Sequence, residues 1–527
     1  MATTTKTRGS WIEELSIHYV PVTERHGKPR DQFTVWFAAN LSAIGLFLGS
    51  LSVVLGLTLP WAIVAILVGY VFGALIVAFH AMQGPKLGVP QMIQSRGQFG
   101  FYGAGVFFLA TFVLEFGYTA AQTVLQGQAM NQVVPHLSIL LWIFIFTIPT
   151  IVLAIFGYDW VHRWQRWATI VLGITVLVML IQALMFKPGL SSAEGSWAAP
   201  QLPLFTLVTA IYLIAIASWA PNVSDYSRYL PEKVNSARTF WAIFWGMVAS
   251  AVIAGIGAYI TALLPKAGLF GAVDTISGPV IVVIMALSLI GTNVLTTYTG
   301  MLSLTSAVST FRKIPVSQVI RIVGVVITAG AAFVAAALGY NSFLTSFQNF
   351  LDVLLFVFIP WSAVNLFDYY FVRKGVYNVQ AFFDPDGEYR GFRVIPVVVY
   401  LVGLGVELLF INQTFYVGPL VAPLGGADIS WIVGFVVPFG LYWLIARLWP
   451  ETAGVNVSIE HGALDVSMET DFLPNGSPAP GAAGGTPAPG AAATGGAAAA
   501  GPPADLAPGA GNAGTARGRK GIGQPQA

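Results

Sequence analysis

The sequence predicts an all-α integral membrane protein with twelve transmembrane helices, and its composition and apolar windows carry that prediction. Of 527 residues, 56% are hydrophobic and only 9% are charged, which is more apolar surface than a soluble domain of this length buries. A window of about 20 apolar residues crosses a hydrocarbon core of about 30 Å. Twelve such windows lie at 33–57, 60–82, 102–130, 137–157, 166–186, 203–221, 239–264, 278–303, 317–339, 346–371, 394–413 and 429–449.

The placement of Lys and Arg predicts the orientation of these spans, because cytoplasmic loops carry an excess of both. With a cytoplasmic N-terminus, all of the 25 basic residues except Lys187 and Lys266 fall in cytoplasmic segments. We therefore expect a multi-pass protein of the plasma or inner membrane with both termini in the cytoplasm. One missed helix would reverse every later loop, so the same distribution supports an even number of spans.

The predicted spans divide the chain into four parts. Residues 1–32 form a cytoplasmic N-terminal segment, 33–371 a core of ten helices, 372–450 two additional helices, and 451–527 a cytoplasmic tail. The tail is rich in Ala, Gly and Pro and cannot bury a core, so we expect it to be disordered. The chain contains no cysteine, which excludes disulfides and cysteine-ligated metals.

The sixth window is interrupted by a proline and by polar residues. Its apolar run meets Trp219, Pro221, Asn222 and Asp225 while still at membrane depth. Proline cannot donate to the carbonyl one turn back, so the helix is expected to break near 220–222. Freed backbone groups are tolerated at this depth where they line a protein cavity, and the break is therefore a candidate binding site. The alternative is a proline kink beside an interfacial tryptophan.

The first window has a similar character, because small and polar residues interrupt it near its middle. Asn40, Ser42, Gly45 and Gly49 permit local unwinding there. Two broken helices, five spans apart and in opposite orientation, are typical of an inverted repeat of five plus five helices with a site between them. The alternative is that the small residues only let helices approach closely. The pairing with the sixth window favours the site.

Four segments carry a resemblance to a known family. They read GKPRDQFTVWFAANLSAIG, GPKLGVPQMIQSRGQFGFYG, GYTAAQTVLQGQAM and SWAPNVSDYSRYLP. Together they resemble the nucleobase:cation symporter family of the purine-cytosine permease type, over residues 12–450. The resemblance implies a LeuT-like fold, in which a five-plus-five inverted repeat is followed by two C-terminal helices. It also implies secondary active transport by alternating access.

The resemblance implies cation-coupled uptake of a nucleobase such as cytosine or a purine. A permease of the same fold for allantoin, a hydantoin or a thiamine-like compound is the alternative. The implied partners are a small heterocyclic substrate, a coupling cation and the lipid bilayer, with no nucleic acid. We expect a monomer that is not an enzyme, has no catalytic residues, and uses no cofactor or metal beyond H⁺ or Na⁺ as the coupling ion.

A flat heterocycle needs aromatic planes and amide groups that both donate and accept hydrogen bonds. Tyr118 and Gln122 lie four residues apart, on one face of the third span. The resemblance assigns base contacts to these two residues and stacking to Trp219. Family members often have Trp and Asn at the positions of Tyr118 and Gln122, so the resemblance does not identify the base. The alternative is a buried tyrosine with a hydrogen-bonded glutamine. The expected substrate site is completed by Asn222, Ser42 and Thr297.

Glu115 lies three residues before Tyr118 and shares its helix face. A carboxyl group at bilayer depth is costly unless it is paired, protonated or hydrated, which makes Glu115 a candidate proton carrier. A neutral, hydrogen-bonded structural acid is the equal alternative. Glu407 is also at membrane depth, but it lies outside the ten-helix core and is expected to be structural.

The resemblance to sodium-coupled family members places cation ligands at Ser288, Gly291 and Thr292 in the eighth window, with carbonyl oxygens of the first window near Gly45. Gly291 offers no hydroxyl, which favours H⁺ over Na⁺. The alternative for the hydroxyl groups is a bond to their own helix carbonyls. Asp225 and Arg228, at the cytoplasmic end of the sixth window, are expected to gate or brace the inner mouth.

Two other function classes fit the sequence less well. A channel usually repeats pore-lining motifs between subunits, and two broken helices in one chain argue against it. An intramembrane enzyme needs a nucleophile and base or a metal-ligand set, yet the sequence has no HExxH or GxSxG motif. A GxxxxGK[ST] motif is also absent, which argues against ATP hydrolysis.

Overall fold

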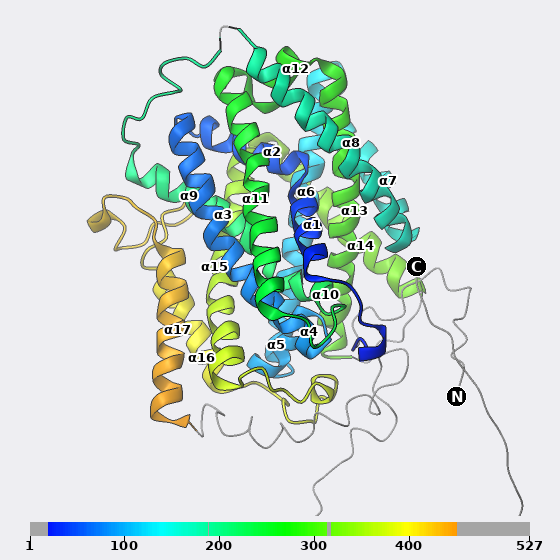
Figure 1. Ribbon diagram of the computed structural model, residues 1–527, viewed down its shortest axis with the longest axis vertical. Coiled ribbons are helices and arrows are strands. Elements are labelled where there is room, and N and C mark those ends of the chain that lie inside the picture. The colour runs from blue at the N-terminus through cyan, green and yellow to red at the C-terminus, as the bar shows by residue number, and fades with distance from the viewer. Residues whose placement is uncertain (1–18, 157, 188, 313–317, 451–527) are drawn as a thin grey trace, which may run out of the picture. The chain divides into compact units, whose positions relative to one another are not determined.

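Helices form almost all of the regular structure in the part of the chain that the computed structural model describes, residues 19–156, 158–187, 189–312 and 318–450. These residues lie within one unit of the chain. The predicted tail lies outside the described residues. The helices, labelled in Figure 1, are α1 Pro29–Asn40, α2 Ala43–Val54, α3 Leu59–Ala81, α4 Gln83–Leu87, α5 Gln91–Phe99, α6 Gly103–Val133, α7 Ile139–Phe156, α8 Tyr158–Met185, α9 Leu202–Ala217, α10 Val223–Ser227, α11 Ser236–Leu263, α12 Gly268–Ser277, α13 Pro279–Ser309, α14 Gln318–Gly339, α15 Phe343–Phe367, α16 Val394–Glu407 and α17 Ser430–Leu448.

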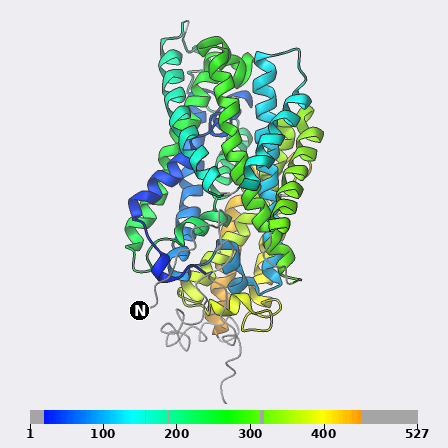
Figure 2. The ribbon, with the colours of Figure 1, turned by 90° about the vertical axis from the view of Figure 1, so that its right-hand side faces the viewer.

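Each of the twelve predicted windows coincides with a helix or a pair of helices. Within the described ranges, seven helical runs are long and apolar enough to cross a membrane, and the bent pair α1 and α2 makes eight. One of these runs, Gln318–Val372, holds both α14 and α15, and shorter apolar helices occupy Ile139–Ile155, Thr169–Met185 and Val394–Glu407. The long helices run along the vertical axis in both views (Figures 1 and 2).

The break predicted in the first window is confirmed. Helix α1 ends at Asn40, and α2 begins at Ala43 after a bend of 60°. Ser42 has an extended backbone, and its Oγ accepts a hydrogen bond from the Gly45 amide at 3.4 Å. Serine is a favoured N-cap because this bond satisfies an amide that has no partner inside the helix. The polar residue therefore begins the second half-helix.

The break in the sixth window is milder than the sequence predicts. Helix α9 ends at Ala217, a 3₁₀ turn occupies Ala220–Asn222, and α10 continues to Ser227. The amide of Asn222 bonds to the carbonyl of Trp219 at 3.1 Å, three residues back. Pro221 removes one donor, and the chain tightens its turn instead of unwinding. The backbone stays helical in direction through the interruption.

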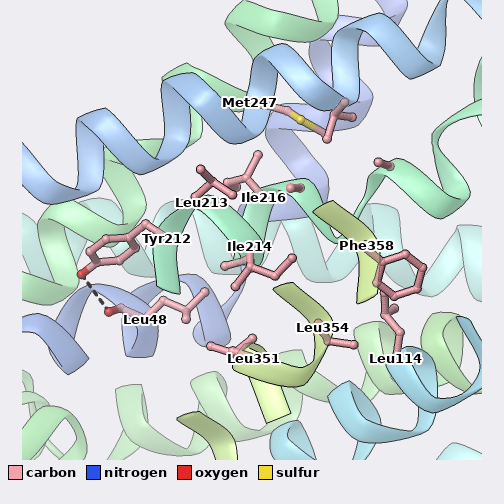
Figure 3. Close-up of a cluster of buried hydrophobic side chains, with 14 of the residues drawn as sticks. Leu48, Leu114, Tyr212, Leu213, Ile214, Ile216, Met247, Leu351, Leu354 and Phe358 are labelled. Carbon is pink, nitrogen blue, oxygen red and sulfur yellow. Dashed lines mark hydrogen bonds between the residues drawn. The ribbon is translucent and has the colours of Figure 1, made fainter. Parts of the chain in front are cut away.

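Helix α9 is enclosed by protein. Every residue from Val208 to Ala217 is buried, which is typical of a helix that is apolar on all faces and is surrounded by other helices. Figure 3 shows side chains of α2, α6, α11 and α15 around it, and the hydroxyl of Tyr212 donating to the carbonyl of Leu48 at 3.0 Å. Helix α9 therefore holds the residues that follow it in a fixed place.

Close packing of α2 against α11 depends on glycine. A Cβ atom on Gly257 would lie 1.9 Å from the carbonyl oxygen of Leu46, and one on Gly49 would lie 1.7 Å from the carbonyl oxygen of Ala254. Small residues thus let the two backbones touch, as is common between membrane helices. The first window is therefore both interrupted, because Ser42 begins a half-helix, and closely packed, because Gly49 allows close approach.

We predict that Gly257→Ala destabilises the protein by about 1–3 kcal/mol, because the new methyl group forces the two helices apart. The apparent melting temperature in detergent measures the effect. The matched control is Gly330→Ala in α14, where a Cβ meets nothing within 4 Å. Equal melting temperatures for the two variants would contradict the packing described here.

Candidate functional site

A cavity of about 570 Å³ lies between the two interrupted helices, within the size range of small-molecule sites. Side chains of α1, α2, α6, α9, α10 and α13 contribute to its wall. Eight of the residues predicted from the sequence line it: Ser42, Gly45, Glu115, Tyr118, Gln122, Trp219, Asn222 and Thr292. The predicted residues Thr297, Ser288 and Gly291 are not among those that line it.

Trp219 is held in place at the end of α9. Its Nε1 donates to the Oδ1 of Asn40 at 3.3 Å, and Asn40 is the last residue of α1. Its ring makes a T-shaped contact with Trp36, with centroids 5.6 Å apart. The indole therefore bridges the two interruptions with a fixed ring plane, and it lines the cavity. Such a plane can stack on a flat ligand.

Tyr118 and Gln122 present different groups to the cavity. The Tyr118 hydroxyl shares a hydrogen bond with the Oγ of Ser218 at 3.0 Å, and the Gln122 Nε2 donates to the carbonyl of Tyr118 at 3.2 Å. The Oε1 of Gln122 is buried and has no hydrogen-bond partner among the described residues. A buried acceptor without a partner is costly, so a ligand N–H group is a fitting partner.

Glu115 connects α6 to the interruption after α9. Its Oε1 accepts a hydrogen bond from the Nδ2 of Asn222 at 2.5 Å, and its side chain is only 3% exposed. Because one side-chain N–H of Asn222 donates to Glu115, the second N–H and the carbonyl oxygen of this amide are the groups left for a ligand. A change in the charge of Glu115 would act directly on the residue that follows Pro221.

The hydroxyl groups of Ser288 and Thr292 on α13 form hydrogen bonds within their own helix. The Oγ of Ser288 donates to the carbonyl of Met285 at 2.7 Å, and the Oγ1 of Thr292 donates to the carbonyl of Leu289 at 3.0 Å. These bonds reach three residues back and agree with the structural alternative for these residues. Lone pairs on both oxygens stay free to accept or to ligate.

Thr297 is buried away from the cavity, and its hydroxyl has no hydrogen-bond partner within the described ranges. The neighbouring Thr296 lines the cavity in its place, with its Oγ1 2.7 Å from the Oγ1 of Thr119 on α6. Successive residues of a helix point about 100° apart, which accounts for the exchange. The expectation that Thr297 faces the substrate is therefore not met by its position.

Asp225 and Arg228 lie at the far end of the interrupted sixth span. The Nε of Arg228 donates to the backbone carbonyl of Asp225 at 3.3 Å, while the Asp225 carboxylate accepts the amide of Gln91 at 3.0 Å. Gln91 is the first residue of α5, where a carboxylate meets the positive end of the helix. Asp225 thus fastens α10 to α5.

Sequence reasoning missed a buried chain of side-chain hydrogen bonds next to this point. We call it the polar chain; in order, its donors and acceptors are Ser224, Gln91, Gln83, Asn365, Gln98, Tyr377 and Asp368, at distances from 2.5 to 3.3 Å. It runs from α10 through α4, α5 and α15. Asp368 also accepts from Tyr442 of α17 and lies 3.4 Å from Arg393. The run of glutamines after residue 82 was the available signal.

The chain was compared with known proteins. A family model described as "Permease for cytosine/purines, uracil, thiamine, allantoin" matches residues 19–434. The Bacillus subtilis protein named "Putative purine-cytosine permease YxlA" is 35% identical over 83% of this chain and 96% of its own. The purine-cytosine permease FCY21 of Saccharomyces cerevisiae is 25% identical over 78% of this chain and 81% of its own.

Solved structures of the transporter Mhp1 share the fold. The inward-facing conformation has a TM-score of 0.68 at 18% identity and covers 84% of this chain and 96% of Mhp1. A closed conformation with bromovinylhydantoin bound has a TM-score of 0.65 at 19% identity and covers 84% and 97%. The protein is a multi-pass membrane protein with the Mhp1 fold, and the chain belongs to the family of permeases for cytosine and purines, uracil, thiamine and allantoin.

Proposed function

We propose that this protein is a secondary active transporter that takes up a nucleobase, such as cytosine or a purine, together with a cation. The observation that carries the proposal is the cavity between two interrupted helices, whose wall includes an indole bonded to Asn40 and an amide oxygen that has no hydrogen-bond partner among the described residues. Trp219 supplies the stacking plane, and Gln122 accepts an N–H group from the edge of the base. Tyr118, Asn222 and Ser42 complete the wall.

A permease for a related heterocycle is the second candidate. Relatives at 24% and 23% identity are named as a vitamin B6 transporter of Saccharomyces cerevisiae and an allantoin permease of Bacillus subtilis. These ligands also present a ring with polar groups at its edge, so one cavity type serves them all.

The proposed topology has twelve spans with both termini in the cytoplasm. Helices α4, α5 and α10 lie at one end of the long axis and α12 at the other (Figure 1), as expected for segments assigned to opposite sides by their basic residues. Residues 33–371 form the proposed core, with its five-plus-five inverted repeat, and 372–450 the two additional helices. The proposed oligomeric state is a monomer.

The cavity is proposed to face the cytoplasm in this structure. It extends along Thr34 of α1 and Thr169 of α8, both in the halves of their helices assigned to the inner side. On the opposite side Phe47 of α2 packs against Phe343 and Phe347 of α15, with ring centroids 5.5 and 5.9 Å apart. This aromatic cluster closes the outer route, as alternating access requires.

Proton coupling is proposed to use Glu115. Loss or gain of its proton changes the hydrogen bond to Asn222, so binding of the ion acts on the same segment that carries Trp219. The alternative sodium site uses the carbonyl of Gly45 with Ser288, Gly291 and Thr292. Asp225 and Arg228 are proposed to gate the inner mouth through the contact with α5.

We expect Trp219→Ala to abolish saturable uptake of a radiolabelled nucleobase while protein abundance stays near normal, because the lost group is a stacking plane inside a cavity. Trp443→Ala is the matched control, since Trp443 is 48% exposed on α17 and does not line the cavity. Uptake by Trp219→Ala within twofold of the unmodified protein would remove Trp219 from the proposed site.

Gln122→Leu keeps the volume of the side chain but removes its donor and acceptor. An unpaired ligand edge costs about 1–3 kcal/mol, so substrate affinity should fall roughly ten- to a hundredfold. The Michaelis constant for uptake in vesicles measures this loss. Gln132→Leu, near the C-terminal end of the same helix and outside the cavity, should leave the constant unchanged, and an unchanged constant in Gln122→Leu as well would refute the contact.

Glu115→Gln imitates the protonated carboxyl group. It should permit exchange of substrate between the two sides of a vesicle but stop accumulation driven by an imposed pH gradient. Glu407→Gln, a buried acid outside the cavity, should keep both activities. A Glu115→Gln protein that still concentrates substrate when Na⁺ is present, and loses this when choline replaces Na⁺, would establish sodium coupling instead.

A further inference from the structure

A second cavity, of about 490 Å³, shares no lining residue with the first. It lies at the same end of the molecule as α4. The end of α3, α4, the beginning of α11 and the turn after α15 form its walls. It is lined by Phe79, Lys86, Glu232, Phe240, Tyr370 and Lys374, among others. Its loops are those assigned to the cytoplasm, so under the proposed orientation it lies at the level of the inner lipid headgroups.

The charges around this cavity favour an anion. Lys86 of α4 and Lys374 of the turn after α15 both line it, while Glu232 is the only acidic residue that lines it within the described part of the chain. Lys86 lies 3.7 Å from Glu232, and both side chains are partly exposed, so this ion pair is weak and can exchange with another anion. Ser236, the first residue of the long helix α11, adds the positive end of a helix dipole.

Lys374 is held at the rim by an unusual backbone conformation. Its φ of 51° makes it the one residue other than glycine with a positive φ among those described. The turn is closed by Gly375, whose amide bonds to the carbonyl of Tyr369 at 2.8 Å. L-residues rarely adopt this conformation unless the surrounding structure imposes it, and such positions concentrate at ligand sites.

One wall of the cavity is aromatic and includes an exposed phenylalanine. Phe79 packs against Phe240 and Tyr370, with ring centroids 4.8 and 5.8 Å apart, and is itself 42% exposed. Trp241 of α11 contacts Phe240, with ring centroids 5.2 Å apart, and Trp241 and Trp245 are 50% and 53% exposed. Exposed tryptophans are typical of the membrane interface, where they contact both headgroups and acyl chains.

We propose that this cavity binds an anionic phospholipid of the cytoplasmic leaflet. Lys86 and Lys374 hold the phosphate, and the acyl chains lie along Phe79, Phe240 and Trp241. Basic cavities between membrane helices on the cytoplasmic side are suited to such headgroups. The lipid bridges α3 and α11 to the turn after α15, and it occupies space that the transported ligand does not use.

Native mass spectrometry of the full chain in detergent tests the proposal, with phosphatidylglycerol and phosphatidylcholine of equal chain length as competing lipids. Phosphatidylglycerol should be retained in clear preference, and the preference should fall about tenfold or more in the double variant Lys86→Gln, Lys374→Gln. The double variant Lys187→Gln, Lys266→Gln, in the loops assigned to the outside, is the matched control and should keep it. No headgroup preference, or an equal loss in both double variants, would overturn the proposal.

Two further arms separate a lipid from a free phosphate compound. Glycerol 3-phosphate carries the charge without the chains, so it should fail to displace phosphatidylglycerol at equal concentration; displacement would identify a site for a soluble phosphate and refute the lipid. Trp241→Ala should weaken phosphatidylglycerol and phosphatidylcholine to the same degree, because it removes chain contact only. Lys374→Gly removes the charge and relaxes the backbone, and it should lose headgroup preference without a lower melting temperature.

Discussion

The constraint that governs this structure is that a backbone amide or carbonyl inside a bilayer needs a partner from the protein. The chain meets it by different means at its two interruptions. After α1, the hydroxyl of Ser42 accepts a hydrogen bond from a backbone amide of the next half-helix. After α9, the backbone hydrogen bond at Asn222 reaches three residues back in a 3₁₀ turn that contains Pro221. Asn40 and Trp219, one from each interruption, then bond to each other. The cavity thus lies where the regular backbone hydrogen bonding of two helices is interrupted.

A rigid surrounding makes these interruptions useful. Helix α9 is buried from Val208 to Ala217, and glycines let α2 pack directly on α11, so the interruptions lie in close-packed surroundings. The parts able to respond are short: the 3₁₀ turn, α10 and the bond between Glu115 and Asn222. A change in the charge of Glu115 would act first on this segment of a few residues.

The sequence foretold the helices and both interruptions, because apolar length, proline and clustered small polar residues are local signals. Eight of the predicted site residues line the cavity, among them Glu115, Tyr118 and Gln122, which follow helical spacing. Thr297, which is expected from the sequence to face the substrate, is not among the residues that line the cavity in this structure; Thr296, one step along the helix, lines it instead. The hydrogen bond between Asn40 and Trp219 joins residues far apart in the chain. A local sequence pattern cannot predict such a pair. The roles proposed for these residues remain predictions.

The polar chain has a direction. From Ser224 through Gln91, Gln83, Asn365, Gln98 and Tyr377, each group donates forward to the next, and the last proton points at the carboxylate of Asp368. Dipoles aligned in this way polarise one another, as in a file of ordered water molecules. Reversal of one amide would set donor against donor on one side and acceptor against acceptor on the other. The direction of the Ser224 hydroxyl on α10 therefore depends on Asp368, which also accepts a hydrogen bond from Tyr442 of α17.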